Sequence, residues 1–306
     1  MTRLRPSTRV PITLRRVPCF VCAALLGLGA CFGQEPPKVE PTPPQDPVAD
    51  MLKAIKDAGL VVDTAAKTIV VPAVMGRPAD PIEFVLVHRR GKGHETLFVT
   101  DVKASILNAA MLLIGFQPGE NAKSVERVPL PTPEEVAKGA LLADTFPPKG
   151  MNVWFVARWK KTDLEGKEID VEVPVEDLIL DLATQRAIED VDWIYLGGNL
   201  APLYRNEPPV FIGDYEGNLV SQVYRAPANH LVTVRHAAAD DDERWWITEL
   251  APPPDTPVQL VISREQPKLH QERAERIQKR KAAEAAAAPK DGAKDGVKDG
   301  ETKKDG

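Results

Sequence analysis

The residues best suited to acid–base chemistry in this chain are the adjacent pair His94 and Glu95. An imidazole beside a carboxylate can transfer protons or hold a metal ion, and Glu83 is a third candidate on the preceding apolar run. Neighbouring side chains on a strand point to opposite faces, so His94 and Glu95 share a site only where a bulge intervenes. Two interpretations stay open. One is a metal-assisted or hydrolase-like site built from these residues; the favoured one is a structural role in which Glu95 caps a helix or pairs with a cation such as Arg89.

The other residues of chemical interest form no recognised motif. His88, His230 and His236 are scattered, without the HxxxH or HxH spacing of metal ligands. The acidic run at 240–243 lacks the alternating spacing and the glycine of a calcium loop, and is interpreted as a surface turn. No serine stands in a G-x-S-x-G context, and neither a G-x-G-x-x-G nor a Walker loop occurs. We therefore predict no cofactor, no metal and no catalytic residue beyond the pair above.

All three cysteines, the last of them Cys31, lie within residues 1–31. This segment carries five arginines and no acidic residue, and its apolar run at 17–30 is shorter than the about 20 residues that span a bilayer. A basic start, a short apolar run and small residues after it are typical of an export signal. Residues 28–31, Leu-Gly-Ala-Cys, resemble the lipobox of bacterial lipoproteins, which implies a lipid on Cys31; ordinary cleavage nearby is the alternative. We expect an exported protein, either anchored to a membrane in the periplasm or secreted.

The charge and the cysteine content of residues 32–263 limit the classes of partner that this part of the chain can bind. Residues 32–263 hold 22 basic and 35 acidic residues, a net charge of −13. Such a body repels a phosphate backbone, so we expect no nucleic acid partner. Without cysteines it offers no thiolate to zinc or to an iron–sulfur cluster. We expect an unidentified envelope protein or polymer as partner, with the membrane reached only through a lipid anchor.

Composition divides the chain into five parts. Proline-rich segments tend to an extended conformation and build no core, and Lys-Asp-Gly repeats contain too little apolar surface to fold. Roughly 200 residues between these segments suffice for one sizeable core. The parts are the export signal at 1–31, a proline-rich linker at 32–50, one globular domain at 51–263, a solvated helix at 264–288 and a disordered tail at 289–306.

Apolar patterns in the domain predict mainly strands, which are short runs bounded by glycine or polar turns. One helix is predicted at about 102–114, with Asp101 as its N-cap and Gly115 at its end. Because it is apolar nearly all round, we expect it to be buried. The predicted class is α+β, β-dominated, with antiparallel sheets packed around this one buried helix. Strands are predicted at 60–62, 68–71, 82–88, 94–99, 153–159, 168–173, 193–196, 210–212, 219–224, 231–234 and 258–262.

Several short motifs occur in an order that suggests a known family. They are His94-Glu95, the segment 103–105 leading into the helical run 110–115 (AMLLIG), Pro118-Gly119, Trp193–Tyr195 with Gly197, the turn 214–220 and the run 252–262. In this order they resemble the YdjY domain, a family common among exported planctomycete proteins. The resemblance covers about 60–263 and implies a domain and export, without a mechanism. Asn108 stands where the family often has a helical histidine, so a site that needs a histidine pair is incomplete here.

Overall fold

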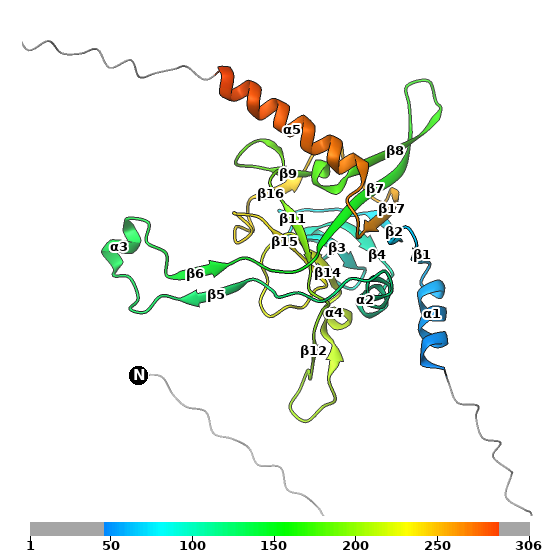
Figure 1. Cartoon of the computed structure of the whole chain (residues 1–306), viewed down its shortest axis with the longest axis horizontal. Coiled ribbons are helices and arrows are strands. Elements are labelled where there is room, and N and C mark those ends of the chain that lie inside the picture. The colour runs from blue at the N-terminus through cyan, green and yellow to red at the C-terminus, as the bar shows by residue number, and fades with distance from the viewer. Residues whose placement is uncertain (1–45, 288–306) are drawn as a thin grey trace, which may run out of the picture. The chain divides into compact units, whose positions relative to one another are not determined.

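A computed structural model describes residues 46–287, and Figure 1 shows their helices and strands. The predicted export signal, Cys31 and the Lys-Asp-Gly tail lie outside the described residues. In chain order the elements are α1 (Pro47–Asp57), β1 (Val61–Asp63), β2 (Thr68–Met75), β3 (Phe84–His88), the 3-10 helix η1 (Gly93–Glu95), β4 (Thr96–Thr100), α2 (Ala104–Leu113), β5 (Lys123–Glu126), α3 (Pro133–Ala137), β6 (Ala143–Phe146), β7 (Asn152–Thr162), β8 (Glu168–Pro174), η2 (Val175–Leu178), β9 (Ile179–Asp181), β10 (Arg186–Ala187), β11 (Asp192–Tyr195), β12 (Leu200–Ala201), β13 (Val210–Phe211), α4 (Ile212–Glu216), β14 (Asn218–Ser221), β15 (Val232–Arg235), β16 (Trp245–Ile247), β17 (Pro257–Ser263) and α5 (Lys268–Ala287).

Eight of these strands form a sheet that closes on itself into a barrel. Their order is β2-β17-β7-β11-β15-β14-β3-β4, and β4 pairs back to β2 at Val74–Val99 and Met75–Phe98. β1 extends the sheet beside β2, and β8 forms a hairpin with β7. Closure leaves few unpaired strand edges, which stabilises the sheet. The α+β, β-dominated class is therefore confirmed.

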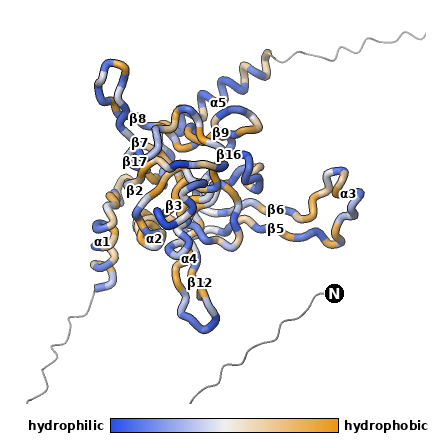
Figure 2. Tube along the Cα trace, turned by 180° about the vertical axis from the view of Figure 1, so that it is seen from behind, coloured by the Kyte–Doolittle hydropathy of each residue, from blue (hydrophilic) through white to orange (hydrophobic). Residues whose placement is uncertain are grey.

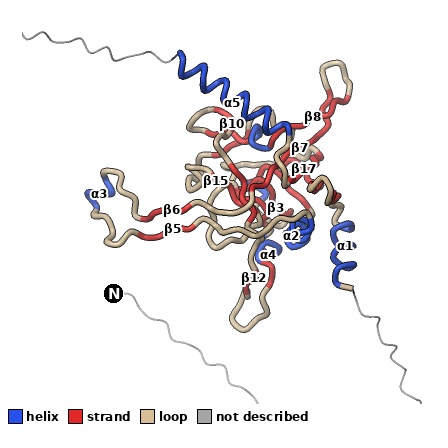
Figure 3. The backbone as a smooth tube through the Cα atoms, in the orientation of Figure 1, coloured by secondary structure: helices blue, strands red, loops and turns tan. Residues whose placement is uncertain are grey.

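The inside of the closed sheet is apolar and aromatic. Along β2, Ile69, Val71 and Met75 are buried and alternate with more exposed residues, as expected for a strand with one covered face. Phe155 and Trp193 meet edge to face with ring centroids 5.6 Å apart, which adds to the stabilisation from burial of both rings. Figure 3 shows most of the strands gathered at the centre of the described region, with β5, β6 and β12 on projections and α1, α3 and α5 at its periphery.

Two pairings in the barrel are parallel, β3–β4 and β14–β15, so the prediction of antiparallel sheets is only partly right. In residues 82–99 two apolar runs flank a glycine-containing loop, and this pattern predicts a hairpin. Instead the loop 89–95 runs back along β3, and Glu83 N–H donates to the carbonyl of Glu95 at 2.9 Å. Seven residues can span roughly 23 Å, which exceeds the length of a five-residue strand. The loop is therefore long enough to start β4 beside the beginning of β3.

The predicted helix is present as α2, but it is covered on one face only. Ala104, Leu107 and Met111 are buried, whereas Leu112 and Leu113 are 46% and 36% exposed. The structure therefore shows one buried face of this helix and not the burial on several sides that its apolar sequence predicts. Because the sheet closes on itself, it covers only one side of a helix beside it, and apolar residues on the other side of α2 keep contact with solvent.

The cap of α2 also differs from the prediction. Lys103 occupies the N-cap position without a side-chain hydrogen bond, and Asp101 pairs with Arg89 instead. The carboxylate of Asp214, in α4, accepts from Ser105 N at 2.8 Å and from Ser105 Oγ at 2.5 Å. A residue 109 positions away thus satisfies the free backbone N–H that an N-cap normally binds.

The ends of the described region depart from the predicted boundaries. α1 begins at Pro47, inside the predicted linker, where Asp46 accepts from Val48 N and caps it. The predicted C-terminal helix is present as α5, but its first half is packed rather than solvated, since His270 and Arg273 are 5% and 8% exposed. None of the helices in residues 46–287 combines the length and the apolar character needed to cross a membrane.

Candidate functional site

The structure brings the predicted residues His94, Glu95 and Glu83 together. His94 and Glu95 lie in the 3-10 turn η1 rather than on a strand, so their side chains meet, with His94 Nε2 3.2 Å from Glu95 Oε1. Lys92 Nζ lies 3.0 Å from both Glu83 Oε2 and Glu95 Oε2. Arg225 also pairs with Glu83. This cluster is a network of ion pairs at the start of β3 and β4.

The charges in this cluster satisfy one another. Burial alone would raise the pKa of Glu95, but hydrogen bonding with Glu83 and Lys92 and the charges of Lys92 and His94 hold that pKa below its ordinary value. A general acid needs a raised pKa, so Glu95 is poorly suited to donate a proton. Glu95 thus pairs with Lys92 and His94, whereas Arg89 pairs with Asp101.

The other predicted histidines contact backbone. The Nδ1 atoms of His88 and His236 accept from the N–H of Arg90 at 3.2 Å and of Ala238 at 3.0 Å, so both rings close turns. Within residues 46–287, no three His, Cys, Asp or Glu side chains are grouped closely enough to ligate a metal.

His230 lies in a fully buried polar region beside β14 and β15 and is 0% exposed. Its Nδ1 is 2.9 Å from Asn229 Oδ1, while its Nε2 and both amide atoms of Gln222 have no hydrogen-bond partner among the described residues. Burial, and then the positive charge of Arg225, lower the pKa of His230 to about 4. The imidazole is therefore neutral at pH 7.

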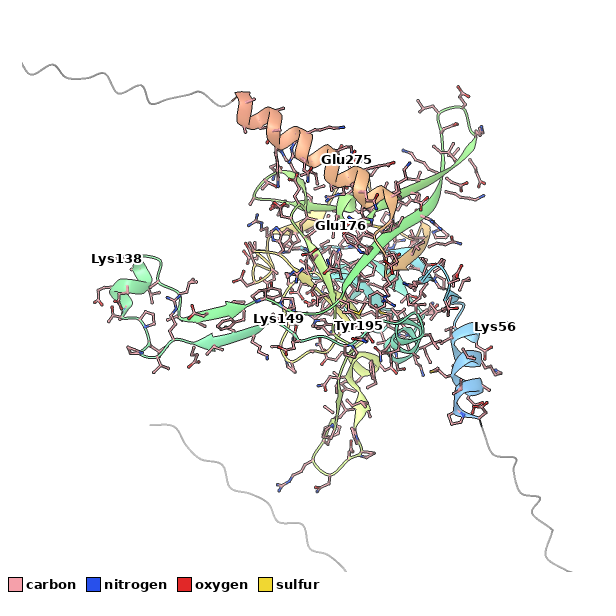
Figure 4. The ribbon with its side chains drawn as sticks, viewed as in Figure 1. Lys56, Lys138, Lys149, Glu176, Tyr195 and Glu275 are labelled. Carbon is pink, nitrogen blue, oxygen red and sulfur yellow. The ribbon has the colours of Figure 1, made fainter. Side chains whose placement is uncertain are left out.

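A cavity between α5 and the sheet gathers further polar groups, and it is called the α5 cavity below. Its volume is about 380 Å³, which is within the range of small-molecule sites. Figure 4 shows Glu176 beneath α5, on the side of the helix that faces the sheet. The lining residues are Trp154, Glu176, Asp190, Val191, Asp192, Gln266, His270, Arg273, Ala274, Ile277, Gln278 and Lys281.

The buried pair Glu176 and His270 forms the inner wall of the α5 cavity. His270 Nε2 lies 3.2 Å from Glu176 Oε2, and Trp193 Nε1 donates to Glu176 Oε1 at 2.8 Å. Trp154 meets the imidazole edge-on, with ring centroids 5.0 Å apart. These contacts hold the ring in one orientation. Its Nδ1 is buried and has no hydrogen-bond partner among the described residues.

Electrostatics keep Glu176 ionised in this setting. Burial alone would raise the pKa of Glu176, but the hydrogen bond and the charge of His270, with a smaller effect from Arg273, hold that pKa below its ordinary value. A carboxylate that orients an imidazole is also the arrangement of a general base. The residues that line the α5 cavity include no hydroxyl or thiol, so they offer no serine, threonine or cysteine nucleophile.

Sequence reasoning missed His270 because the apolar pattern of α5 is weak. The helix is bound by complementary charge instead: Arg273 pairs with Asp177, and Arg280 and Lys281 pair with Glu189. A basic helix that follows an acidic body was the available signal.

A larger groove, of about 810 Å³, lies where the β7–β8 hairpin meets β2 and β17. Its charged residues pair across the hairpin, Arg158 with Glu172 and Lys160 with Glu168. None of the polar residues that line this groove is buried, whereas the α5 cavity is lined by the buried residues Glu176 and His270.

Comparison of the chain with protein-family models, with curated proteins and with solved structures found no match. The resemblance to the YdjY domain therefore stays a prediction.

Proposed function

We propose that this chain is a non-catalytic binding module of the cell envelope that holds a neutral, polyhydroxylated segment of a polymer in the α5 cavity. One observation carries the proposal: a buried histidine, oriented by Glu176, lines a cavity together with an indole ring. An apolar wall with a few oriented polar groups is the usual composition of a ligand site.

The chemistry of the lining favours sugar hydroxyls over a charged ligand. Trp154 offers an aromatic edge or face to the apolar side of a sugar ring. Gln266 and Gln278 supply amide donors and acceptors. The charged side chains that line the cavity have partners of opposite charge. Lys281 pairs with Asp190 at 2.7 Å, Arg273 with Asp177 and Asp192 with Arg235, so little unpaired charge is left for a charged ligand.

Export is part of this proposal. It is supported by the basic start and the short apolar run of residues 1–31, and Cys31 is the residue that a lipid anchor would use. A module held at a membrane surface or secreted meets envelope polymers directly.

The alternative of a hydrolase-like or metal-assisted enzyme near His94 and Glu95 has less support. The carboxylates there are occupied by Lys92 and Arg225, and the pKa of Glu95 is lowered rather than raised. Acid–base catalysis requires a group whose pKa is close to the working pH.

We also propose that the sheet packs on the inner face of α2 and that the stability of the sheet depends on this packing. The proposal is supported by the burial of Leu107, Ala110 and Met111 against the main core.

Isothermal titration calorimetry with neutral trisaccharides (maltotriose, cellotriose and chitotriose) tests the binding proposal. At least one should bind, and Trp154→Ala should weaken the binding about fivefold, because one aromatic contact contributes about 1 kcal/mol. Tyr204→Ala is the matched control: this aromatic residue is 66% exposed, does not line the cavity, and should leave affinity unchanged. Absence of binding to all three sugars, or equal binding by the Trp154 variant, would refute the proposal.

A further inference from the structure

Residues 120–149 form an arm that projects from the barrel (Figure 1). The strands β5 and β6 pair only with each other, over Lys123–Phe146 and Glu126–Ala143, and α3 lies at the tip. At the base, the bridge Glu120–Lys149 links the two sides. In Figure 4 the labelled residues Lys138 and Lys149 mark the tip and the base.

The arm has no core of its own. All of its residues are described, and none between 123 and 147 is buried. A two-stranded ribbon is at best marginally stable in water unless something packs against it. Ordering about 25 residues costs conformational entropy, which only burial of apolar surface offsets.

Apolar side chains are nevertheless concentrated on the arm, and Figure 2 shows hydrophobic stretches along it. The β7–β8 hairpin, which also projects, exposes only Leu164 and Ile169 among its large apolar residues and carries paired charges instead. The exposed arm residues, with their exposed fractions, are Val125 (54%), Val128 (94%), Leu130 (60%), Val136 (39%), Leu141 (62%), Leu142 (55%) and Phe146 (52%).

The exposed surface matches what a dimer needs. These seven residues present roughly 750 Å² to solvent, close to the about 800 Å² that each partner buries in a stable protein–protein interface. Exposed apolar surface of this extent is typical of interaction sites on soluble proteins.

Charge favours the arm as the contact between two copies. The segment 120–149 carries five acidic and four basic residues, so it is nearly neutral, whereas residues 32–263 as a whole have a net charge of −13. Two such acidic bodies repel each other at short range. Contact through a projecting, nearly neutral arm joins two chains while the charged bodies stay apart.

We propose that two copies of this chain associate through their arms, with the apolar residues of one arm packed on those of the other about a two-fold axis. The same surface then serves both partners, as in most homodimers. This inference is independent of the α5 cavity, because no arm residue lines that cavity.

Sedimentation equilibrium of the full chain at micromolar concentrations tests the inference. The expected mass is twice the 33.5 kDa of one chain. The triple variant Val128→Ser, Leu141→Ser and Leu142→Ser should sediment at half the wild-type mass. Leu164→Ser, a change of an exposed leucine on the other hairpin, should stay dimeric.

Far-ultraviolet circular dichroism of the three proteins should coincide, because none of the changed residues is buried. A monomeric wild type would overturn the inference, and so would a triple variant that stays dimeric. If the two chains associate through another contact, including one through the apolar segment of residues 1–31, the triple variant stays dimeric.

Discussion

His230 should make the protein sensitive to acid, and a single substitution should remove that sensitivity. The imidazole is fully buried, and burial together with the charge of Arg225 lowers its pKa to about 4. In the unfolded chain the same group binds its proton at the ordinary pKa of about 6.5. Between these two values the unfolded state holds the proton and the folded state does not.

Proton linkage gives the direction and the size of the change in folding stability due to His230. As the pH falls from 7 to 4, protonation stabilises the unfolded state, so stability is lost over this window. The two pKa values differ by about 2.5 units, and each unit corresponds to 1.36 kcal/mol, so the loss due to His230 is roughly 3 kcal/mol at pH 4.

The variant His230→Phe tests this magnitude. Phenylalanine has a similar size, removes the unpaired Nε2, and gives up only the contact with Asn229, which keeps its bond to Glu216. At pH 7 the variant should therefore be within about 1 kcal/mol of the wild type.

Urea unfolding of both proteins at pH 7, 6, 5 and 4 provides the measurement. Carboxylates with lowered pKa, such as Glu176 and Glu95, also cost stability in acid, but they are common to both proteins. The difference between the two proteins isolates His230 and should move by roughly 3 kcal/mol in favour of the variant. Parallel curves would show that His230 is hydrated in the folded protein and would refute the reasoning.

Three further predictions concern the packing of the helices. His270→Phe leaves the buried Glu176 carboxylate without its imidazole partner, and should either destabilise the fold by about 3 kcal/mol or release α5. Thermal unfolding and hydrogen exchange of α5 distinguish the two results, and no change in either measurement would contradict a stabilising Glu176–His270 contact. Asp214→Ala removes the cap of α2 and should lower the free energy of unfolding, measured with denaturant, by about 1–2 kcal/mol. Asp101→Ala should change it by less than about 0.5 kcal/mol. Equal losses in the two variants would contradict the long-range cap. Leu107→Ala should lower the free energy of unfolding by about 2–5 kcal/mol, because the sheet packs on this buried side chain of α2. A loss below about 1 kcal/mol would refute the proposal that the sheet depends on α2.

Local patterns were enough to place most elements of the fold. The β-branched run of β2, the β7–β8 hairpin around its Asp163–Lys167 turn and the apolar helix α2 were all indicated by periodicity and turn residues. The β3–β4 pair shows the limit, because a glycine-containing loop of seven residues suits either a hairpin or a return to a parallel strand. Which one forms depends on contacts of the loop with β3 and with Gly217, far along the chain.

The candidate sites also differ in whether their residues lie close together in the sequence. Glu83, Glu95 and His94 could be grouped from the sequence because they lie within 12 residues of one another. The pairing of Glu176 with His270 joins residues 94 positions apart, and the pairing of Ser105 with Asp214 joins residues 109 positions apart. No local pattern encodes either contact.

The amino-acid sequence by itself determined which segments become strands and helices, because backbone preferences and the alternation of apolar residues act over a few neighbours. Only the tertiary structure decided that the sheet closes, that α2 is covered on one face, and that α5 is bound over a buried carboxylate. These outcomes depend on which distant surfaces exclude water together, and that is a property of the packed chain rather than of any one segment.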